Sequence, residues 1–156
     1  MKIQIQLFFA AAVSTTSSFV LAANEETKIS ALQWSHIQKM NARCLEHARK
    51  SKQDVAIAIY DQGGILLSFT QTDGAAPATG EVARWKGTSA AYYRLATAKA
   101  AEWGIHALPK IAIVQGGLPI FSADGKPLGG IGISGAPPEF DEECAALATQ
   151  AAGLRN

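Results

Sequence analysis

The chain has 156 residues, a formal net charge of +1 and 48% hydrophobic residues, so it is long enough for one domain with a hydrophobic core. Its 14 Lys and Arg residues are scattered and form no basic stripe, which argues against nucleic-acid binding. Cys44 and Cys144 are the only cysteines, and no CxxC or Cys/His spacing supports structural zinc.

The first 23 residues have the pattern of a secretory signal peptide. Lys2 precedes an apolar stretch at 7–13, and Val20-Leu21-Ala22 provides the cleavage site. A membrane anchor is the alternative, but Ser and Thr residues at 14–18 interrupt the apolar run, which is shorter than the roughly 20 residues of a membrane span. We therefore expect a domain at 24–156 that is periplasmic or secreted, without stable membrane insertion.

The first predicted element of this domain is a helix from Ser30 to about Lys50. Ser30-Ala31-Leu32-Gln33 has the pattern of a capping box, and apolar residues, Cys44 among them, then recur at helical spacing. Cys144 falls in the last predicted helix. A disulfide between the first and last helices is therefore one alternative, and two buried free thiols are the other.

A β-hairpin and a second helix follow. Residues 55–60 are apolar on both faces, with β-branched residues on one side and alanines on the other, as in a central strand covered twice. A turn at 61–64 leads into an alternating strand at 65–70. The next helix is predicted to start at a Thr79 cap and to reach Tyr93.

The second half of the chain contains a short predicted helix within 95–103, then apolar segments at 111–114 and 116–121. A turn at 123–126 precedes a strand at 128–135 that contains four glycines. Because glycine weakens a strand, this composition indicates that another backbone, a helix or a ligand approaches closely there.

A closing helix is predicted to begin at Pro137-Pro138-Glu139, with acidic residues, Asp141 among them, near the positive end of its dipole. Its buried face is expected to carry Phe140, Cys144, Leu147 and Ala151. The predicted order of elements along the chain is helix, hairpin, helices, hairpin and helix. This order is typical of an α+β protein, best built as a mostly antiparallel sheet with helices on its faces.

Six stretches of the sequence follow one another in the order and spacing of the GlcG/HbpS family, which includes the C-terminal domain of PduO adenosyltransferases. They are residues 57–64, 72–75, 86–91, 116–120, 130–135 and 139–142. The chain resembles this family along essentially the whole of 24–156. The resemblance implies an α+β, profilin-like fold with a five-stranded, mostly antiparallel sheet, helices on both faces, and assembly into homo-oligomers.

One part of the chain departs from the family pattern. Family members usually read Lys-Ala-Arg-Thr-Ala where this chain reads Lys86-Gly87-Thr88-Ser89-Ala90, so Thr88 stands in place of an arginine. A threonine cannot imitate the bidentate guanidinium, so an anionic-ligand role tied to that arginine is not expected here. Lys86 and Thr88 remain candidate ligand contacts, the alternative being helix surface or a subunit contact. Tyr92 and Tyr93 either stack on a flat ligand or pack in the interior.

Characterised members of the family bind haem, whose iron needs an axial ligand such as His, Met, Cys or Tyr. His106 is the first candidate for the iron because it lies in a predicted loop beside Trp103, whose indole could cover a porphyrin. His36 on the first helix is the second candidate, whereas His47, between charged neighbours, is expected on a solvated face. The alternative for each is an ordinary surface histidine.

The sequence therefore predicts an exported haem-binding protein with slow haem-degrading or iron-sequestering activity. A non-catalytic oligomeric module that binds another small ligand, such as a corrinoid or an organic acid, is the alternative. An enzyme acting on a small carbonyl compound or hydroxy acid rests only on the likeness to GlcG. Ser134 lacks the second spaced glycine of a nucleophile elbow, and no base can be assigned to it.

Overall fold

A four-stranded antiparallel sheet lies between helices in the computed structural model, which describes residues 31–104 and 107–156. The strands, in chain order, are β1 (Ala56–Asp61), β2 (Leu66–Gln71), β3 (Gly117–Phe121) and β4 (Pro127–Ser134). They lie in the order β2-β1-β4-β3 across the sheet, and every neighbouring pair is antiparallel. The two predicted hairpins therefore form the two halves of one sheet.

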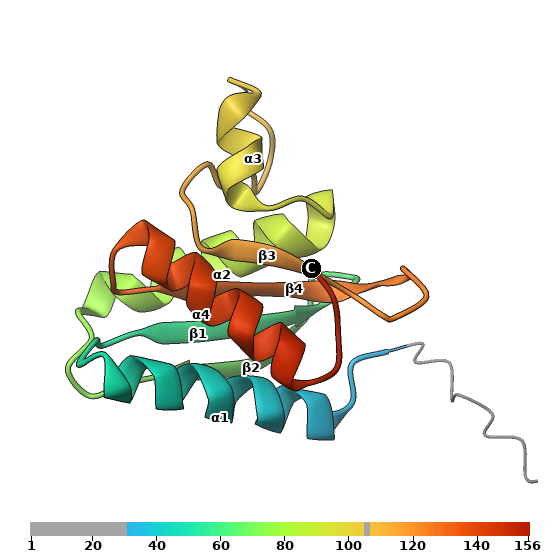
Figure 1. Ribbon diagram of the computed structural model, residues 1–156. Helices are drawn as coiled ribbons and strands as arrows, with labels where there is room; N and C mark the ends of the chain where they lie inside the picture. The colour runs from blue at the N-terminus through green and yellow to red at the C-terminus, as the bar shows by residue number, and fades with distance from the viewer. Residues whose placement is uncertain (1–30, 105–106) are drawn as a thin grey trace, which may run out of the picture.

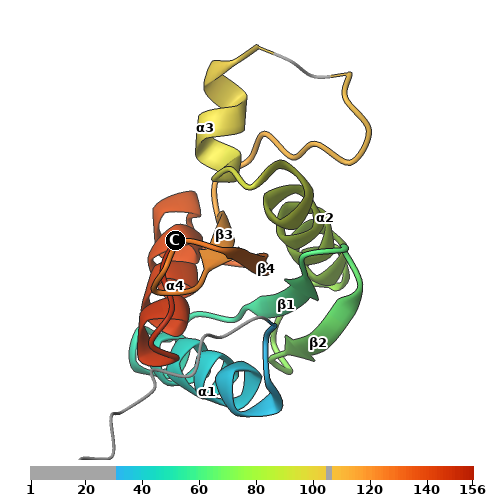
Figure 2. The same cartoon turned by 90° about the vertical axis from the view of Figure 1, so that its right-hand side faces the viewer.

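Helices cover both faces of this sheet (Figure 1). They are α1 (Trp34–Lys50), α2 (Pro77–Tyr93), α3 (Thr97–Glu102) and α4 (Pro138–Ala151). Figure 2 shows α1 and α4 on one face and α2 on the other, with α3 projecting at one end. None of the helices described is both long and apolar enough to cross a bilayer. The α+β class with helices on both faces is confirmed.

The central strand β1 separates two hydrophobic layers, as its sequence predicted. Ile57 and Ile59 belong to the larger core with residues of α1 and α4, whereas Ala58 and Tyr60 pack with Ala83 and other residues of α2. Successive side chains of a strand point to opposite faces, so branched residues fill one layer and small residues admit a helix on the other. The side occupied by alanines is therefore the side where α2 comes close.

The glycines of β4 allow α2 to rest directly on the sheet. A Cβ added at Gly130 would lie 2.6 Å from the carbonyl oxygen of Gly87, and one at Gly132 would overlap backbone atoms of Ala83 and Gly87. In return, a Cβ added at Gly87 would lie 2.9 Å from the carbonyl oxygen of Ala58. The predicted close approach to the glycine-rich strand is confirmed, and the approaching group is the backbone of a helix.

Two helices begin at other residues than the sequence predicted. Helix α1 begins at Trp34 with Gln33 as its N-cap, and the backbone N–H of Gln33 donates to His36 Nδ1 at 3.1 Å. The capping motif is thus built on Gln33 and not on Ser30, which lies outside the described residues. Helix α2 begins at Pro77, because proline suits the first helical position, where no hydrogen bond to its nitrogen is needed.

The expectation of a five-stranded sheet is wrong for the described part of the chain. Residues 111–114, the apolar segment before β3, form no strand, and Ala112 is bonded to a side chain of α2. The backbone N–H of Ala112 donates to the Ser89 hydroxyl oxygen at 2.8 Å, so a helix side chain takes the place of a strand partner. Ile111 and Ala112 are nevertheless buried, because they pack as a covering segment.

A disulfide bond joins Cys44 of α1 to Cys144 of α4, whose Cα atoms are 5.1 Å apart. Both cysteines are fully buried, so the bond ties the two helices of one layer together beneath the surface. The face of α4 that packs inward is rotated from the predicted one, since Leu147 is half-buried and Ala151 exposed. Its buried residues are Asp141, Cys144, Ala145, Ala148 and Thr149.

The contact between α2 and β4 leads to a stability prediction. Gly132→Ala should lower the free energy of unfolding by about 2–3 kcal/mol, because the added methyl group overlaps backbone atoms of α2 that cannot move independently. Urea unfolding followed by circular dichroism measures the change. Gly63→Ala is the matched control, since a Cβ there would meet only the Asp61 carboxylate, at 3.3 Å. Equal stability of the two variants would contradict the account.

Candidate functional site

The side of α2 that faces away from the sheet carries two aromatic residues and a threonine at helical spacing. Trp85, Thr88 and Tyr92 lie within one stripe of the helix, opposite the buried Gly87. Trp85 is 39% exposed and Tyr92 is 42% exposed, while Thr88 between them is half-buried. We call these three residues the outer face of α2. Two exposed rings on either side of a hydroxyl can contact a flat apolar ligand.

The Tyr92 ring is held in place from two directions. On one side it covers the turn between β1 and β2, where a Cβ added at Gly64 would lie 2.5 Å from the Tyr92 Cζ atom. On the other side Lys110 Nζ donates to the Tyr92 hydroxyl oxygen at 3.0 Å and lies 4.4 Å from the ring centroid. The ring is thus positioned beside an exposed cation.

The segment that follows α3 is attached to α2 by hydrogen bonds. The Tyr93 hydroxyl donates to the carbonyl oxygen of Pro109 at 2.6 Å, and the Ala112 N–H donates to Ser89, as described above. Leu108 and Val114 of this segment are exposed apolar residues. The sequence offered two roles for Tyr93, and the structure gives it an anchoring contact.

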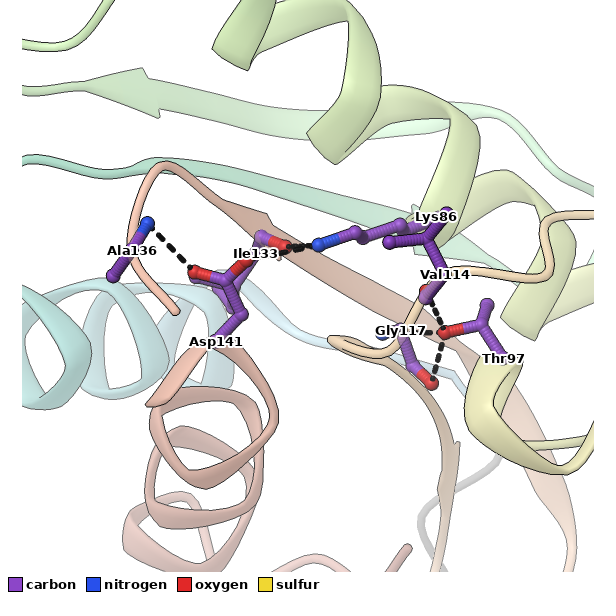
Figure 3. A network of polar contacts seen from close by, with 7 residues as sticks. All are labelled: Lys86, Thr97, Val114, Gly117, Ile133, Ala136 and Asp141. Carbon is purple, nitrogen blue, oxygen red and sulfur yellow. Dashed lines mark hydrogen bonds and ion pairs between the residues drawn. The ribbon is translucent and has the colours of Figure 1, made fainter. Parts of the chain in front are cut away.

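Lys86 points away from the outer face and into the protein. Its ammonium donates to Asp141 Oδ2 at 2.9 Å and to the carbonyl oxygen of Ile133 at 2.9 Å (Figure 3). The other oxygen of Asp141 accepts the Ala136 N–H at 3.2 Å. Both side chains are almost fully buried, so this ion pair joins α2 to α4 past the end of β4. Burial raises the pKa of Asp141, against the opposing attraction of Lys86.

Gly116 and Gly117 make room for this ion pair and for Thr97. Gly116 has φ +116°, and a Cβ there would lie 2.8 Å from Lys86 Nζ. A Cβ at Gly117 would lie 2.6 Å from Thr97 Cγ2, and the Thr97 hydroxyl accepts the Gly117 N–H at 2.9 Å and donates to Val114 O at 2.7 Å. Figure 3 shows both networks side by side. The paired glycines therefore have a packing role.

The structure separates the residues that the sequence proposed as ligand contacts. Thr88 lies on the outer face of α2, whereas Lys86, two residues earlier, is committed to Asp141. His36 lies at the start of α1, on the opposite side of the sheet from α2. His106 lies outside the described residues, so its role as iron ligand stays a prediction. The sequence did not identify Asp141 as a partner of Lys86; it explained the acidic residue by the helix dipole alone.

The geometry of His36 favours a structural role. Its Nδ1 accepts the Gln33 N–H, and its pKa is lowered by burial and by the nearby Lys39 charge, so the ring is neutral with its hydrogen on Nε2. An iron-bound Nε2 would require the hydrogen on Nδ1, where it would face the Gln33 N–H. His36 therefore cannot accept the Gln33 N–H through Nδ1 and bind iron through Nε2 at the same time.

His47 lies between two helices and not on the solvated face that the sequence suggested. Its ring stacks on Phe140 with centroids 4.5 Å apart, and its Nε2 is 3.6 Å from a carboxylate oxygen of Glu143. In the parts of the chain that the structure describes, no three His, Cys, Asp or Glu side chains gather in a way that could hold a metal ion. These residues alone therefore point to no metal cluster.

A shallow hollow of about 440 Å³ lies beside the C-terminus, apart from the outer face of α2. It is lined by residues of α4 and of the last segment of the chain: Glu143, Ala146, Leu147, Gln150, Leu154, Arg155 and Asn156. This hollow contains no histidine and no aromatic ring. The exposed aromatic surface of α2 is therefore the better candidate for a flat ligand.

Residues 32–150 match the model of the family described as haem degrading protein HbpS-like. GlcG of Escherichia coli K12 is 30% identical over 95 residues, which cover 57% of this chain and 70% of GlcG. The crystal structure of a double mutant of Streptomyces reticuli HbpS has a TM-score of 0.72 at 27% identity and covers 91% of this chain and 97% of that one. A crystal structure of a PduOC:haem complex has a TM-score of 0.73 at 24% identity and covers 80% of this chain and 96% of that one. At this identity the similarity shows the fold alone.

The buried ion pair gives a pH-dependent prediction. Lys86→Met should lower the free energy of unfolding by about 3–5 kcal/mol at neutral pH, because it leaves the Asp141 carboxylate buried without its cation. Without Lys86, burial raises the folded-state pKa of Asp141 further above the unfolded value. The loss should therefore be smaller at about pH 5, where a larger fraction of this carboxyl is protonated, than at about pH 8. Urea unfolding at both pH values measures it.

A second variant shows whether the pair acts as a unit. Lys86→Met combined with Asp141→Leu removes both charges, and we expect it to recover most of the stability lost in the single variant. The account is contradicted if Lys86→Met is as stable as the wild type at both pH values, or if its loss of stability does not change with pH.

Proposed function

Since this chain belongs to the family of HbpS-like haem-degrading proteins, as its sequence indicated, we propose that it binds haem at the outer face of α2. The observation that carries the proposal is the exposed pair of rings, Trp85 and Tyr92, on either side of Thr88. A porphyrin is flat and apolar, and an aromatic side chain contacts such a ligand over a large area. The solved PduOC:haem complex, which shares the fold, supports the choice of ligand.

The residues around this face suit the polar parts of haem as well. Its propionates need cations at the edge of an apolar surface, and Lys110 is held there by Tyr92. Arg94, the exposed C-cap of α2, is a second cation, two residues after Tyr92. His106 remains the proposed iron ligand, and the Thr88 hydroxyl on the outer face of α2 is proposed as a further contact to the haem. Lys86 is not part of this proposal, because its ammonium donates to Asp141 and to the carbonyl oxygen of Ile133.

The chain itself is proposed to hold and orient the haem. When bound, the haem iron would supply the redox chemistry that haem degradation requires. Lys86 is the one ionisable side chain in residues 86–90, where this chain differs from the family pattern. It is not free to give a proton to a ligand, since its ammonium is buried and paired with Asp141. Slow degradation or iron sequestration is therefore proposed rather than rapid turnover.

A non-catalytic module for another flat ligand is the second candidate, and the observation that favours it is Thr88. The hydroxyl lacks the positive charge of the arginine found in relatives, and the outer face of α2 is otherwise aromatic. Such a surface could contact the macrocycle of a corrinoid through the same two aromatic rings. The two candidates differ in whether iron porphyrin is preferred.

Haemin titration of the purified protein tests the proposal. We expect a sharp Soret band at one haemin per site, and Trp85→Ala should weaken binding about tenfold, which corresponds to a loss of about 1.4 kcal/mol. Trp34→Ala is the matched control, because Trp34 is an exposed tryptophan at the start of α1, on the opposite side of the sheet. His106→Ala should shift the Soret maximum, because the axial ligand changes.

Two outcomes would count against haem. The first is an absence of any spectral change at micromolar haemin, in which case titration with a corrinoid examines the second candidate. The second is an equal loss of affinity in Trp85→Ala and Trp34→Ala, which would place the ligand away from α2.

We also propose that the domain is exported and works outside the cytoplasm. The signal-like pattern of residues 1–23 and the buried Cys44–Cys144 disulfide both support this, because disulfides persist in oxidising compartments. Mass analysis of protein recovered from outside the cytoplasm should find a chain starting at Ala23 or Asn24. Reduction should then add the mass of two hydrogen atoms. A chain that keeps Met1, or free thiols before reduction, would contradict export.

A further inference from the structure

One cation of α2 is held in place at the border of the outer face. The carbon at the centre of the Arg84 guanidinium lies over the Phe69 ring of β2, 3.9 Å from its centroid. The attraction between a cation and an aromatic face restricts the arginine side chain without using any of its N–H groups. Arg84 is therefore positioned on the side of α2 that faces β2 before any ligand arrives.

Most of the hydrogen-bond donors of Arg84 are available to a ligand. Within the described part of the chain its guanidinium makes one hydrogen bond, from Nη1 to Glu81 Oε1 at 2.6 Å. A guanidinium has five N–H groups, and two of them can bind one carboxylate side by side. The side chains of Arg84 and Glu81 are 36% and 77% exposed, so their ion pair contributes little to stability. A ligand can therefore bind Arg84 without breaking a buried contact.

Arg84 borders the three residues of the outer face of α2. It precedes Trp85 directly and lies one helical turn before Thr88, which in turn lies one turn before Tyr92. Residues three or four apart on a helix are neighbours on its surface, so the guanidinium, the hydroxyl and the two rings form one continuous surface. A flat ligand that contacts both rings therefore has one edge on the Arg84 side.

Lys110 approaches the same surface from the other side. The segment that carries it is bonded to α2 through Ser89 and Tyr93. With 100° of rotation per residue, Ser89 and Tyr93 are turned from Trp85 in the direction opposite to Arg84. The two rings therefore lie between two exposed cations, one on the helix itself and one on the segment that covers it.

We propose that Arg84 binds a carboxylate of the ligand, so that the outer face of α2 selects flat ligands with free carboxylates. This inference rests on the proposed function and separates its two candidates. Haem carries propionates at one edge of its ring, whereas the side chains of a complete corrinoid end mostly in amides. A carboxylate accepts two charge-assisted hydrogen bonds from a guanidinium, and an uncharged amide or ester gains much less. Arg84 is thus a specificity-determining residue of this surface.

Glu81 gives the proposal a second consequence, of opposite sign. Its carboxylate accepts the Nη1 hydrogen bond of Arg84 and repels another carboxylate that approaches the same cation. Glu81→Gln removes this charge and keeps a side-chain oxygen that can accept the hydrogen bond. Haemin binding should therefore become about threefold tighter in this variant. If Arg84 served only to pack against Phe69, the same change would leave haemin binding as it is.

Paired titrations with haemin and with haemin dimethyl ester, whose propionates are uncharged, test the proposal. Arg84→Met should weaken haemin binding about tenfold and leave binding of the ester unchanged, because methionine covers Phe69 but has no charge. Arg43→Met is the matched control, since Arg43 of α1 pairs with Glu46 at the same i,i+3 spacing and is 33% exposed. Circular dichroism checks that all variants are folded.

The two ligands distinguish a failure of this inference from a failure of the proposed function. An Arg84→Met variant that loses affinity for both ligands alike, or for neither, would overturn the role of Arg84 and leave haem binding standing. An equal loss in Arg43→Met, or weaker haemin binding in Glu81→Gln, would do the same. A wild type that binds neither ligand would overturn the proposed function and this inference with it.

Discussion

The direct contact between the backbone of α2 and the backbone of the sheet is the constraint on which the rest of this structure depends. Gly87 on the helix and Gly130 and Gly132 on β4 remove the side chains that would otherwise keep the two apart. A helix seated this closely cannot rotate about its axis without a backbone collision. Its remaining residues therefore have fixed directions, with Lys86 turned toward α4 and Trp85 turned toward solvent.

Much of the fold could be predicted from the sequence because its signals are local or compositional. The branched and small sides of β1 predicted a strand covered on both faces, and the glycines of β4 predicted a close approach, which the backbone of α2 makes. The errors arose where a distant partner decides the outcome. Residues 111–114 have the composition of a strand, but the Ala112 N–H donates to the Ser89 hydroxyl oxygen. This bond attaches the segment to α2 and not to the sheet. No local pattern contains that information.

The candidate site was predictable only in part, for the same reason. Lys86 and Thr88 are two positions apart, and the sequence offered both as ligand contacts. Lys86 is buried and paired with Asp141, which is distant in sequence, whereas Thr88 lies on the outer face of α2. His36 was a candidate ligand contact, and its Nδ1 accepts the Gln33 N–H at the start of α1, a contact that the sequence pattern did not predict. The disulfide between the first and last helices was one of two alternatives, and only the approach of α1 and α4 in space decides between them.

The central claim is that a flat ligand lies on the side of α2 that the glycine contact turns outward. Paramagnetic broadening of backbone amide signals by ferric haemin, measured by NMR on isotope-labelled protein, locates the ligand directly. The account predicts that signals of Trp85 to Tyr92 and of the residues around Lys110 broaden first, while those of α1 remain sharp. Selective broadening around Leu154 and Asn156, beside the C-terminal hollow, would contradict it.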